Sequence, residues 1–188
     1  TNRRFRLKPA VLFRPGRALL AKFLHYSGPV VLNETLWGLG TALYPTIMGY
    51  MDGSTEILAA YAISGNIEKV CTVIVFAIAG TAAVIIGREI GAGRLDTVYD
   101  TGRTLNTLSF LAGLTVGVLG ILGTLYFISP VVYPNFGLSK EAQDIATMML
   151  LVTFSFLSVR SFNTTNIVGV LRGGGDVRAA TLNDVLPL

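Results

Sequence analysis

Four hydrophobic stretches dominate this sequence, and each is long enough to cross a lipid bilayer as a helix. They cover residues Pro29–Met51, Ile57–Ile86, Leu105–Ile128 and Ile145–Leu171. At about 1.5 Å per residue, roughly 20 helical residues span a hydrocarbon core of ~30 Å. Because the apolar residues form long runs instead of amphipathic stripes, the sequence predicts an all-α fold, a multi-pass transmembrane helical bundle with four spans.

Composition supports a membrane protein. Hydrophobic residues make up 52% of the chain and charged residues 14%, whereas soluble domains carry about 25% charged residues. The net charge of +4 does not indicate a nucleic-acid partner, because seven of the fifteen Lys and Arg residues precede Gly28 and most others flank the spans. The single cysteine, Cys71, lies in an apolar run, so the sequence predicts no disulfide framework and no metal cluster.

The chain divides into three predicted parts. Residues 1–27 form a basic segment in which apolar residues recur at near-helical spacing from Arg17 to His25, either as an amphipathic helix on the membrane or as a solvated linker. Residues 28–178 form the four-helix membrane domain, and residues 179–188 begin a further span. We interpret the sequence as part of a longer membrane protein.

The basic residues between the spans predict the orientation. Twelve Lys and Arg residues lie in the leader, in the second connection and after the fourth span, whereas only Lys140 lies on the opposite side. The positive-inside rule then places the N-terminus of this chain in the cytoplasm. The predicted location is the cell membrane, inner or plasma.

Ionisable residues lie inside three of the four spans. They are Glu34 in the first span, Glu68 and Lys69 in the second, and Arg160 in the fourth. A charge at the bilayer centre costs about 2.5–3.5 kcal/mol on insertion scales, so such residues indicate a polar pathway or site between helices. The leading class is therefore a transporter or a channel.

Glu34 is the candidate for binding a coupling cation or a proton, because desolvation raises the pKa of a carboxyl group. Asn33, Trp37 and Tyr44 lie on an adjoining polar and aromatic stripe, which predicts that they line a cavity. The alternative is that Glu34 reaches the cytoplasmic interface from the first turns of its span.

Arg160 needs an acidic partner near the middle of the membrane, and the candidates are Glu34 and Glu68. The pair is either a structural ion pair or a moving gate. Asn163 and Asn166 follow on the same span and are further candidates for the cavity lining. No Ser/His/Asp set, metal-ligand spacing or phosphate loop can be assembled, so the sequence does not predict an enzyme.

Two segments resemble motifs of the multidrug and toxic compound extrusion (MATE) family. Ala82–Gly93, AAVIIGREIGAG, resembles the motif that closes the second helix of a lobe, and Val170–Arg178, VLRGGGDVR, resembles the LRGxGD motif after the fourth helix. Gly28–Trp37, GPVVLNETLW, is similar to the first helix of the second lobe in a bacterial branch. The motifs occur in the expected order after the second and fourth spans.

The resemblance implies twelve helices in two six-helix lobes, of which this chain holds the first four helices of the second lobe. The partners would then be the first lobe and the remaining helices of the same protein, the lipid bilayer and a small, cationic substrate. Such proteins export drugs in exchange for Na⁺ or H⁺, without another cofactor, by alternating access.

The carry-over of functional residues is partial. Some members hold the coupling ion with an acidic residue on the first helix and another on the fourth. Here Glu34 lies about one turn earlier than the first of these, and Ser161 stands at the second. The resemblance therefore favours Glu34 as a proton carrier or a partner of Arg160. The alternatives are a lipid-linked oligosaccharide or lipid flippase of the same superfamily, and a membrane scaffold without transport.

Overall fold

The computed structural model describes residues 16–185, and within this range every regular element is helical. The all-α prediction is thus confirmed. The elements are α2 (Arg17–Met48), α3 (Ser54–Gly91), α4 (Leu95–Gly123), α5 (Tyr133–Asn135), α6 (Lys140–Ser155), α7 (Leu157–Thr164) and α8 (Val177–Val185), with π-helical segments η1 (Thr124–Val132) and η2 (Thr165–Leu171).

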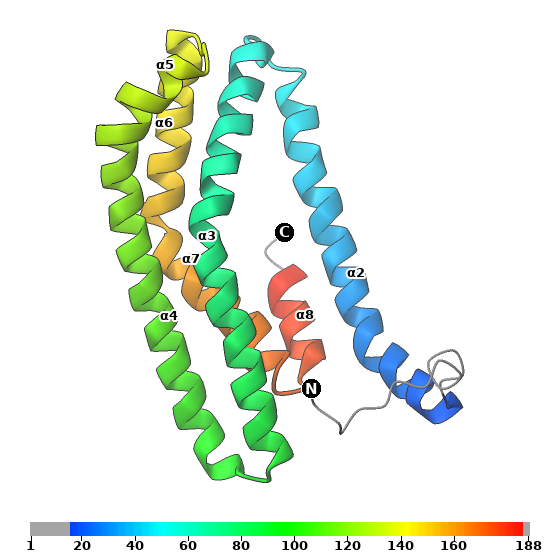
Figure 1. The fold of residues 1–188 in the computed structure, drawn as a ribbon. Helices are drawn as coiled ribbons and strands as arrows, with labels where there is room; N and C mark the ends of the chain where they lie inside the picture. Colours follow the sequence, from blue (N-terminus) through cyan, green and yellow to red (C-terminus); the bar gives the residue numbers. More distant parts are fainter. Residues whose placement is uncertain (1–15, 186–188) are drawn as a thin grey trace, which may run out of the picture.

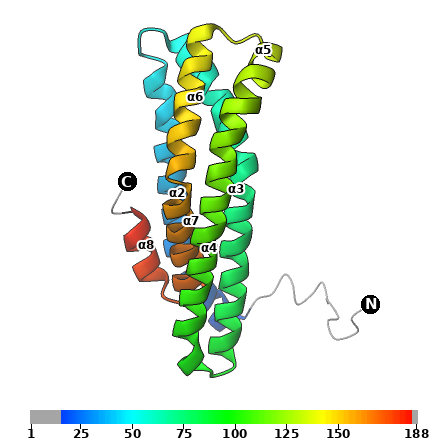
Figure 2. The same cartoon turned by 90° about the vertical axis from the view of Figure 1, so that its left-hand side faces the viewer.

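Three long elements run side by side as a bundle. They are α3, α4 and the continuous path from α6 through α7 to η2 (Figure 1), and the view turned by 90° shows the same arrangement (Figure 2). The core between them includes Val75, Leu150, Phe154 and Leu157, each no more than 3% exposed. Their burial follows from the apolar runs of the sequence.

Small residues on α4 set how closely it packs against α6 and α7. A Cβ atom added to Gly113 would lie 2.6 Å from the Cβ of Ser161, and one added to Gly117 would lie 2.6 Å from the carbonyl oxygen of Phe154. Gly123, the last residue of α4, has open space around its Cβ position. The close packing is therefore confined to the part of α4 that faces the fourth predicted span.

Three of the four predicted spans meet the length and hydropathy expected of a membrane helix. α3 and the stretch Leu95–Asn135 do so alone, and Lys140–Ser155 with Leu157–Leu171 do so as one bent pair. α2 has 32 residues, which is long enough, but it does not reach the same hydropathy. The first predicted span, Pro29–Met51, forms a helix, and its apolar character alone does not establish it as a span.

The fourth predicted span is broken. α6 and the helix that follows are bent by 52° at Phe156. The two halves of this span therefore do not present one continuous face. Phe156 is 65% exposed, whereas Ile167 is 3% exposed.

α2 stands apart from the bundle. Its main neighbour is α8, which lies between α2 and α3 in Figure 1. The helix begins at Arg17 and continues through Pro29 and Pro45 to Met48. Residues 17–25, predicted as a separate amphipathic helix or a linker, are thus the first turns of α2, and the rest of the basic segment lies outside the described residues.

Two glycines permit the turns at the end of the molecule where α3 meets α4. Gly93 and Gly175 have φ angles of 75° and 90°, a region that other residues rarely adopt. Gly87 and Gly91, the other two glycines of the motif Ala82–Gly93, lie within α3. The motif Ala82–Gly93 therefore consists of the last turns of α3 and one glycine, Gly93, in the turn that follows.

Candidate functional site

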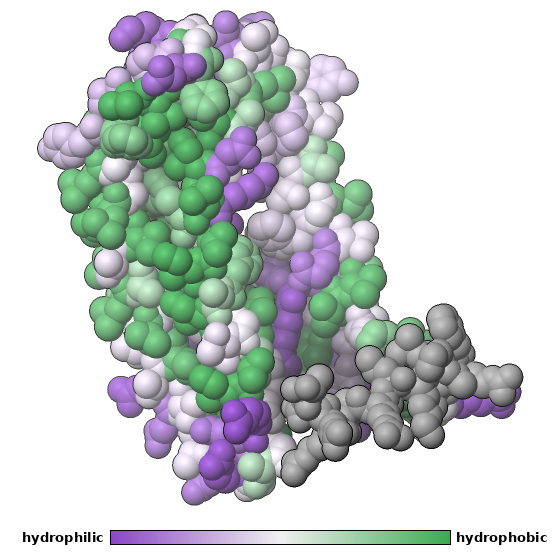
Figure 3. Space-filling view, viewed as in Figure 1, coloured by the Kyte–Doolittle hydropathy of each residue, from purple (hydrophilic) through white to green (hydrophobic). Residues whose placement is uncertain are grey.

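Charged side chains meet in the hollow between α2 and the rest of the bundle. Figure 3 shows hydrophilic residues along this hollow, beside a largely hydrophobic surface on the side of α3 and α4. At its centre, Arg172 donates from Nη1 to Oε1 of Glu34 at 2.7 Å and from Nη2 to Oδ2 of Asp184 at 3.0 Å. One guanidinium group therefore joins α2, the turn after η2, and α8.

Asn33 completes this cluster. Its Nδ2 donates to the same Oδ2 of Asp184 at 2.6 Å, and the residue is fully buried. No other residue of α2 is buried, so α2 is anchored here by polar contacts more than by an apolar core. The Oδ1 atom of Asn33 is buried without a hydrogen-bond partner among residues 16–185. We refer to Asn33, Glu34, Arg172 and Asp184 as the α2–α8 cluster.

Arg160 forms an ion pair with Glu68, and not with Glu34. Of the two candidate partners in the sequence, the structure thus selects Glu68. The pair joins α7 to α3 just beyond the bend at Phe156. The Arg160 side chain is 39% exposed and the Glu68 side chain 27% exposed, so the pair is only partly withdrawn from the surface.

A cleft of about 160 Å³ brings several predicted residues together. It is lined by Glu34, Trp37, Arg160 and Asn163, together with Arg172 and Asp184 and the apolar or small side chains of Phe76, Thr164, Ile167 and Val168. The cleft thus contains members of both ion-pair systems. It lies between α2 and the α7–η2 half of the bent helix.

The other predicted lining residues lie elsewhere. Tyr44 is 55% exposed and does not line the cleft, and Asn33 lies behind it, bonded to Asp184. Asn166 accepts a hydrogen bond from Nδ2 of Asn106 at 3.3 Å and lines a separate groove on the α4 side. Asn163 lies on α7 and Asn166 on the π-helical segment η2, and the two side chains face different neighbours.

Ser161, the position where the family resemblance expects a second carboxylate, faces α4 and not the cleft. Its hydroxyl group donates to the carbonyl oxygen of Ser109 at 2.8 Å, and its own carbonyl oxygen accepts from the Ser109 hydroxyl group at 3.0 Å. Both residues are fully buried. These hydroxyl groups therefore hold two helices together, and they are not available to a ligand in the cleft.

Arg172 and Asp184 are not among the predicted site residues. Arg172 enters the prediction only as a basic residue after the fourth span, and Asp184 lies in the short segment predicted to begin a further span. The available signal was that Asp184 is the one acidic residue in Ala179–Leu188. An acidic residue in an apolar segment predicts a basic partner, and Arg172 is close in sequence.

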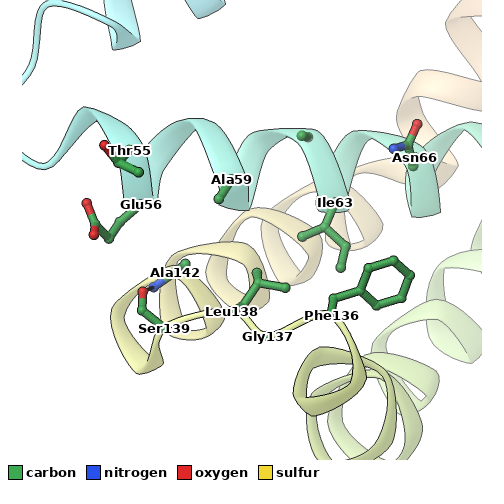
Figure 4. Close-up of a pocket in the computed structure, with 11 residues that line it drawn as sticks. Thr55, Glu56, Ala59, Ile63, Asn66, Phe136, Gly137, Leu138, Ser139 and Ala142 are labelled. Carbon is green, nitrogen blue, oxygen red and sulfur yellow. Dashed lines mark hydrogen bonds between the residues drawn. The ribbon is translucent and has the colours of Figure 1, made fainter.

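A second cavity, of about 420 Å³, lies at the opposite end of the bundle (Figure 4). The first turns of α3 form one side, and the connection from α5 to α6 forms the other. Its lining includes Thr55, Glu56 and Ile63 from α3, and Phe136 and Leu138 from the facing connection. It contains no predicted site residue, and within residues 16–185 no group of three or more His, Cys, Asp or Glu residues is placed to hold a metal ion.

One comparison with known proteins identifies a relationship. The sequence model of the family described as MatE matches residues 29–183. This range begins at Pro29 on α2 and ends one residue before Asp184, so it covers the cleft and both ion-pair systems almost entirely. No curated protein and no solved structure matches the chain.

Proposed function

The chain belongs to the MatE family of membrane transporters, and from this premise we propose that it works in the export of drugs or organic cations in exchange for H⁺ or Na⁺. The exchange would use alternating access in the cell membrane, with the N-terminal end of α2 on the cytoplasmic side. The first lobe and the remaining helices of the same protein would complete the pathway.

The observation that carries this proposal is the shared cleft. Glu34 is a carboxylate on α2 with a side chain that is 61% exposed, and it faces Arg172 in a cleft that also contains Arg160. A proton or a cation on Glu34 weakens its bond to Arg172. Because α2 is held mainly against α8 through this cluster, binding at Glu34 changes the attachment of a whole helix.

Asn33 supports a role for the cluster in holding the coupling cation. Its Oδ1 is a buried amide oxygen without a partner within the described residues, next to the carboxylates of Glu34 and Asp184. Amide and carboxylate oxygens are suitable ligands for Na⁺, and the same carboxylates are sites for H⁺. The proposal therefore places the coupling cation at Glu34, with Asn33 and Asp184 beside it.

The alternatives receive less support. A flippase for lipid-linked sugars needs free basic groups for a pyrophosphate, whereas Arg160 and Arg172 are both engaged by carboxylates. A scaffold needs dry and mutually saturated charges, whereas Glu34 is largely exposed and borders a cleft.

The test is the variant Glu34→Gln in the full-length protein. We expect it to abolish drug resistance in cells while the protein is still expressed at the normal level, because glutamine keeps the shape but cannot take up a proton and has no negative charge to attract a cation. Glu56→Gln is the matched control, since Glu56 is a partly buried carboxylate outside the cleft. Normal resistance in the Glu34 variant would exclude this residue from the mechanism.

A further inference from the structure

A pocket of about 500 Å³ borders Glu68, whereas the cleft described above borders its partner Arg160. It is formed by α3 and α6, with the end of α2 beside them. Its lining includes Met48, Tyr61, Glu68, Met148, Met149 and Thr153. This volume is within the range of sites that hold drug-sized molecules.

Methionines are concentrated in this pocket. The chain has four methionines, and three of them, Met48, Met148 and Met149, line it. The sulfur of Met149 is positioned by the hydroxyl group of Ser64, which donates to it at 3.6 Å. Thioether side chains adapt their shape and contact aromatic rings favourably, which suits apolar ligands of varied outline. Tyr61 adds an aromatic ring that can face a cation.

Glu68 supplies the only formal charge among the residues that line this pocket. Its counterion, Arg160, lines the cleft below and not the pocket. Lys69 follows Glu68 on α3 and is exposed, but it lines neither cavity. The ion pair therefore lies at the boundary between two cavities, with its carboxylate in one and its guanidinium group in the other.

From this arrangement we infer that the methionine pocket binds an apolar, monovalent organic cation, with Glu68 as its counterion. The cation competes with Arg160 for the same carboxylate. When the cation binds, Arg160 is released toward the cleft that contains Glu34. This inference rests on the proposed export function, and it assigns a substrate subsite to a part of the chain away from the coupling residues.

The experiment measures equilibrium binding to the purified full-length protein with two probes of the same shape and opposite charge, tetraphenylphosphonium and tetraphenylborate. We expect the protein to bind the cation and not the anion at this site. Glu68→Gln should weaken binding of tetraphenylphosphonium by about tenfold or more, because one partly desolvated charge pair is lost. Arg160→Gln should tighten it, because the competing counterion is removed.

Two controls use neighbouring residues of the same type. Glu56→Gln removes a carboxylate from α3 outside the pocket, and Met51→Ala removes the one methionine that does not line it. Neither should change the affinity, whereas Met148→Ala should weaken binding. If Glu68→Gln does not fold, the double variant Glu68→Gln/Arg160→Gln removes both charges together and should bind the cation as weakly as expected for the single variant.

Weaker binding by Glu68→Gln together with tighter binding by Arg160→Gln supports the subsite. If the ion pair were only structural, either variant would change the affinity for tetraphenylphosphonium in the same direction. Equal affinity for the two probes, or no effect of Glu68→Gln, would overturn it. Glu34→Gln separates this inference from the proposed function. If Glu34→Gln no longer exports drugs but still binds tetraphenylphosphonium through Glu68, the result agrees with the proposed function and with the subsite. If Glu34→Gln exports drugs normally, only the proposed coupling role of Glu34 is overturned.

Discussion

At the scale of single residues, Arg172 has the most consequential position in the structure. It is 15% exposed and donates to both Glu34 and Asp184, so three segments of the chain depend on one guanidinium group. Arginine suits this position because its fixed fork of donors can engage two carboxylates at once.

We expect Arg172→Gln to lower the free energy of unfolding by about 2–3 kcal/mol, because Asp184 and Asn33 would remain in a partly buried site without a cation. The bond to Glu34 contributes less to the free energy of unfolding than the bond to Asp184, since the Glu34 side chain is more exposed to solvent. Thermal unfolding of the purified protein in detergent measures the change. Arg178→Gln, at an exposed position of α8, is the control and should shift the transition by much less. Equal shifts would contradict the central role of Arg172.

The sequence could identify the unusual residues but not their pairing. Glu34, Glu68 and Arg160 stand out as ionisable groups within apolar runs, and the structure places all three beside cavities. Helical spacing relates residues on one helix only, so it could not decide whether Arg160 meets Glu34 or Glu68. The sequence also could not predict that Tyr44 and Asn166 lie outside the cleft, because their positions depend on how each helix is rotated against its neighbours.

At the scale of helices, α4 depends on glycine for its packing. The backbones of α4 and α7 approach so closely at Gly113 that an added Cβ atom would lie 2.6 Å from the Cβ of Ser161 and 2.9 Å from the carbonyl oxygen of Leu157. Backbone and β-carbon atoms cannot move aside as the end of a flexible side chain can. The contact therefore also protects the buried hydrogen bonds between Ser109 and Ser161.

We expect Gly113→Ala to destabilise the protein by about 1–3 kcal/mol, the usual cost of overpacking a close interface. Gly123→Ala should be neutral or slightly stabilising, because nothing lies within 4 Å of the added atom and alanine favours the helix. Unfolding midpoints of the two variants, compared under the same conditions, give the answer. A loss of stability in Gly123→Ala as large as that in Gly113→Ala would show that the contact is not the cause.

Hydrophobic runs predict helices well, but they do not predict where a helix bends. Proline is the usual sequence signal for a break in a helix, and α2 contains Pro29 and Pro45. The break in the fourth predicted span occurs at Phe156, where the sequence has neither proline nor glycine. Tertiary packing on the two halves of the bent helix, against different parts of α3 and α4, determines that position.

At the scale of the whole molecule, basic residues are concentrated at one end of the bundle. The connection from α3 to α4 and the turn after η2 contain Arg94 and Arg172, whereas the connection from α5 to α6 leads only to Lys140. This asymmetry predicts which end faces the cytoplasm.

Cysteine labelling tests the orientation. In a Cys71→Ser background of the full-length protein, Lys140→Cys should react with a membrane-impermeant maleimide in intact cells, since the predicted topology assigns it to the outer side. Arg94→Cys should react only after the cells are broken open. Both positions are exposed in the structure, so access to the reagent and not burial decides the result. The reverse pattern would invert the proposed topology.

The family relationship was predictable because two short motifs follow the second and fourth predicted spans in the right order, and the matching range of residues 29–183 includes both. The position of α2 was not predictable. A hydropathy pattern shows that a segment can be a helix, but it does not show that the segment stands apart from its neighbours and is held through one buried asparagine and its charged partners.

The bend at Phe156 divides the fourth predicted span into two arms that border different cavities. The arm formed by α6 borders the methionine pocket, and the arm formed by α7 and η2 borders the cleft near Glu34. Phe156 lies at the junction of the two arms. A rotation about this point would move the walls of both cavities at once. Arg160, one turn beyond Phe156, would move with the arm formed by α7 and η2, and so would change its distance from Glu68 on α3.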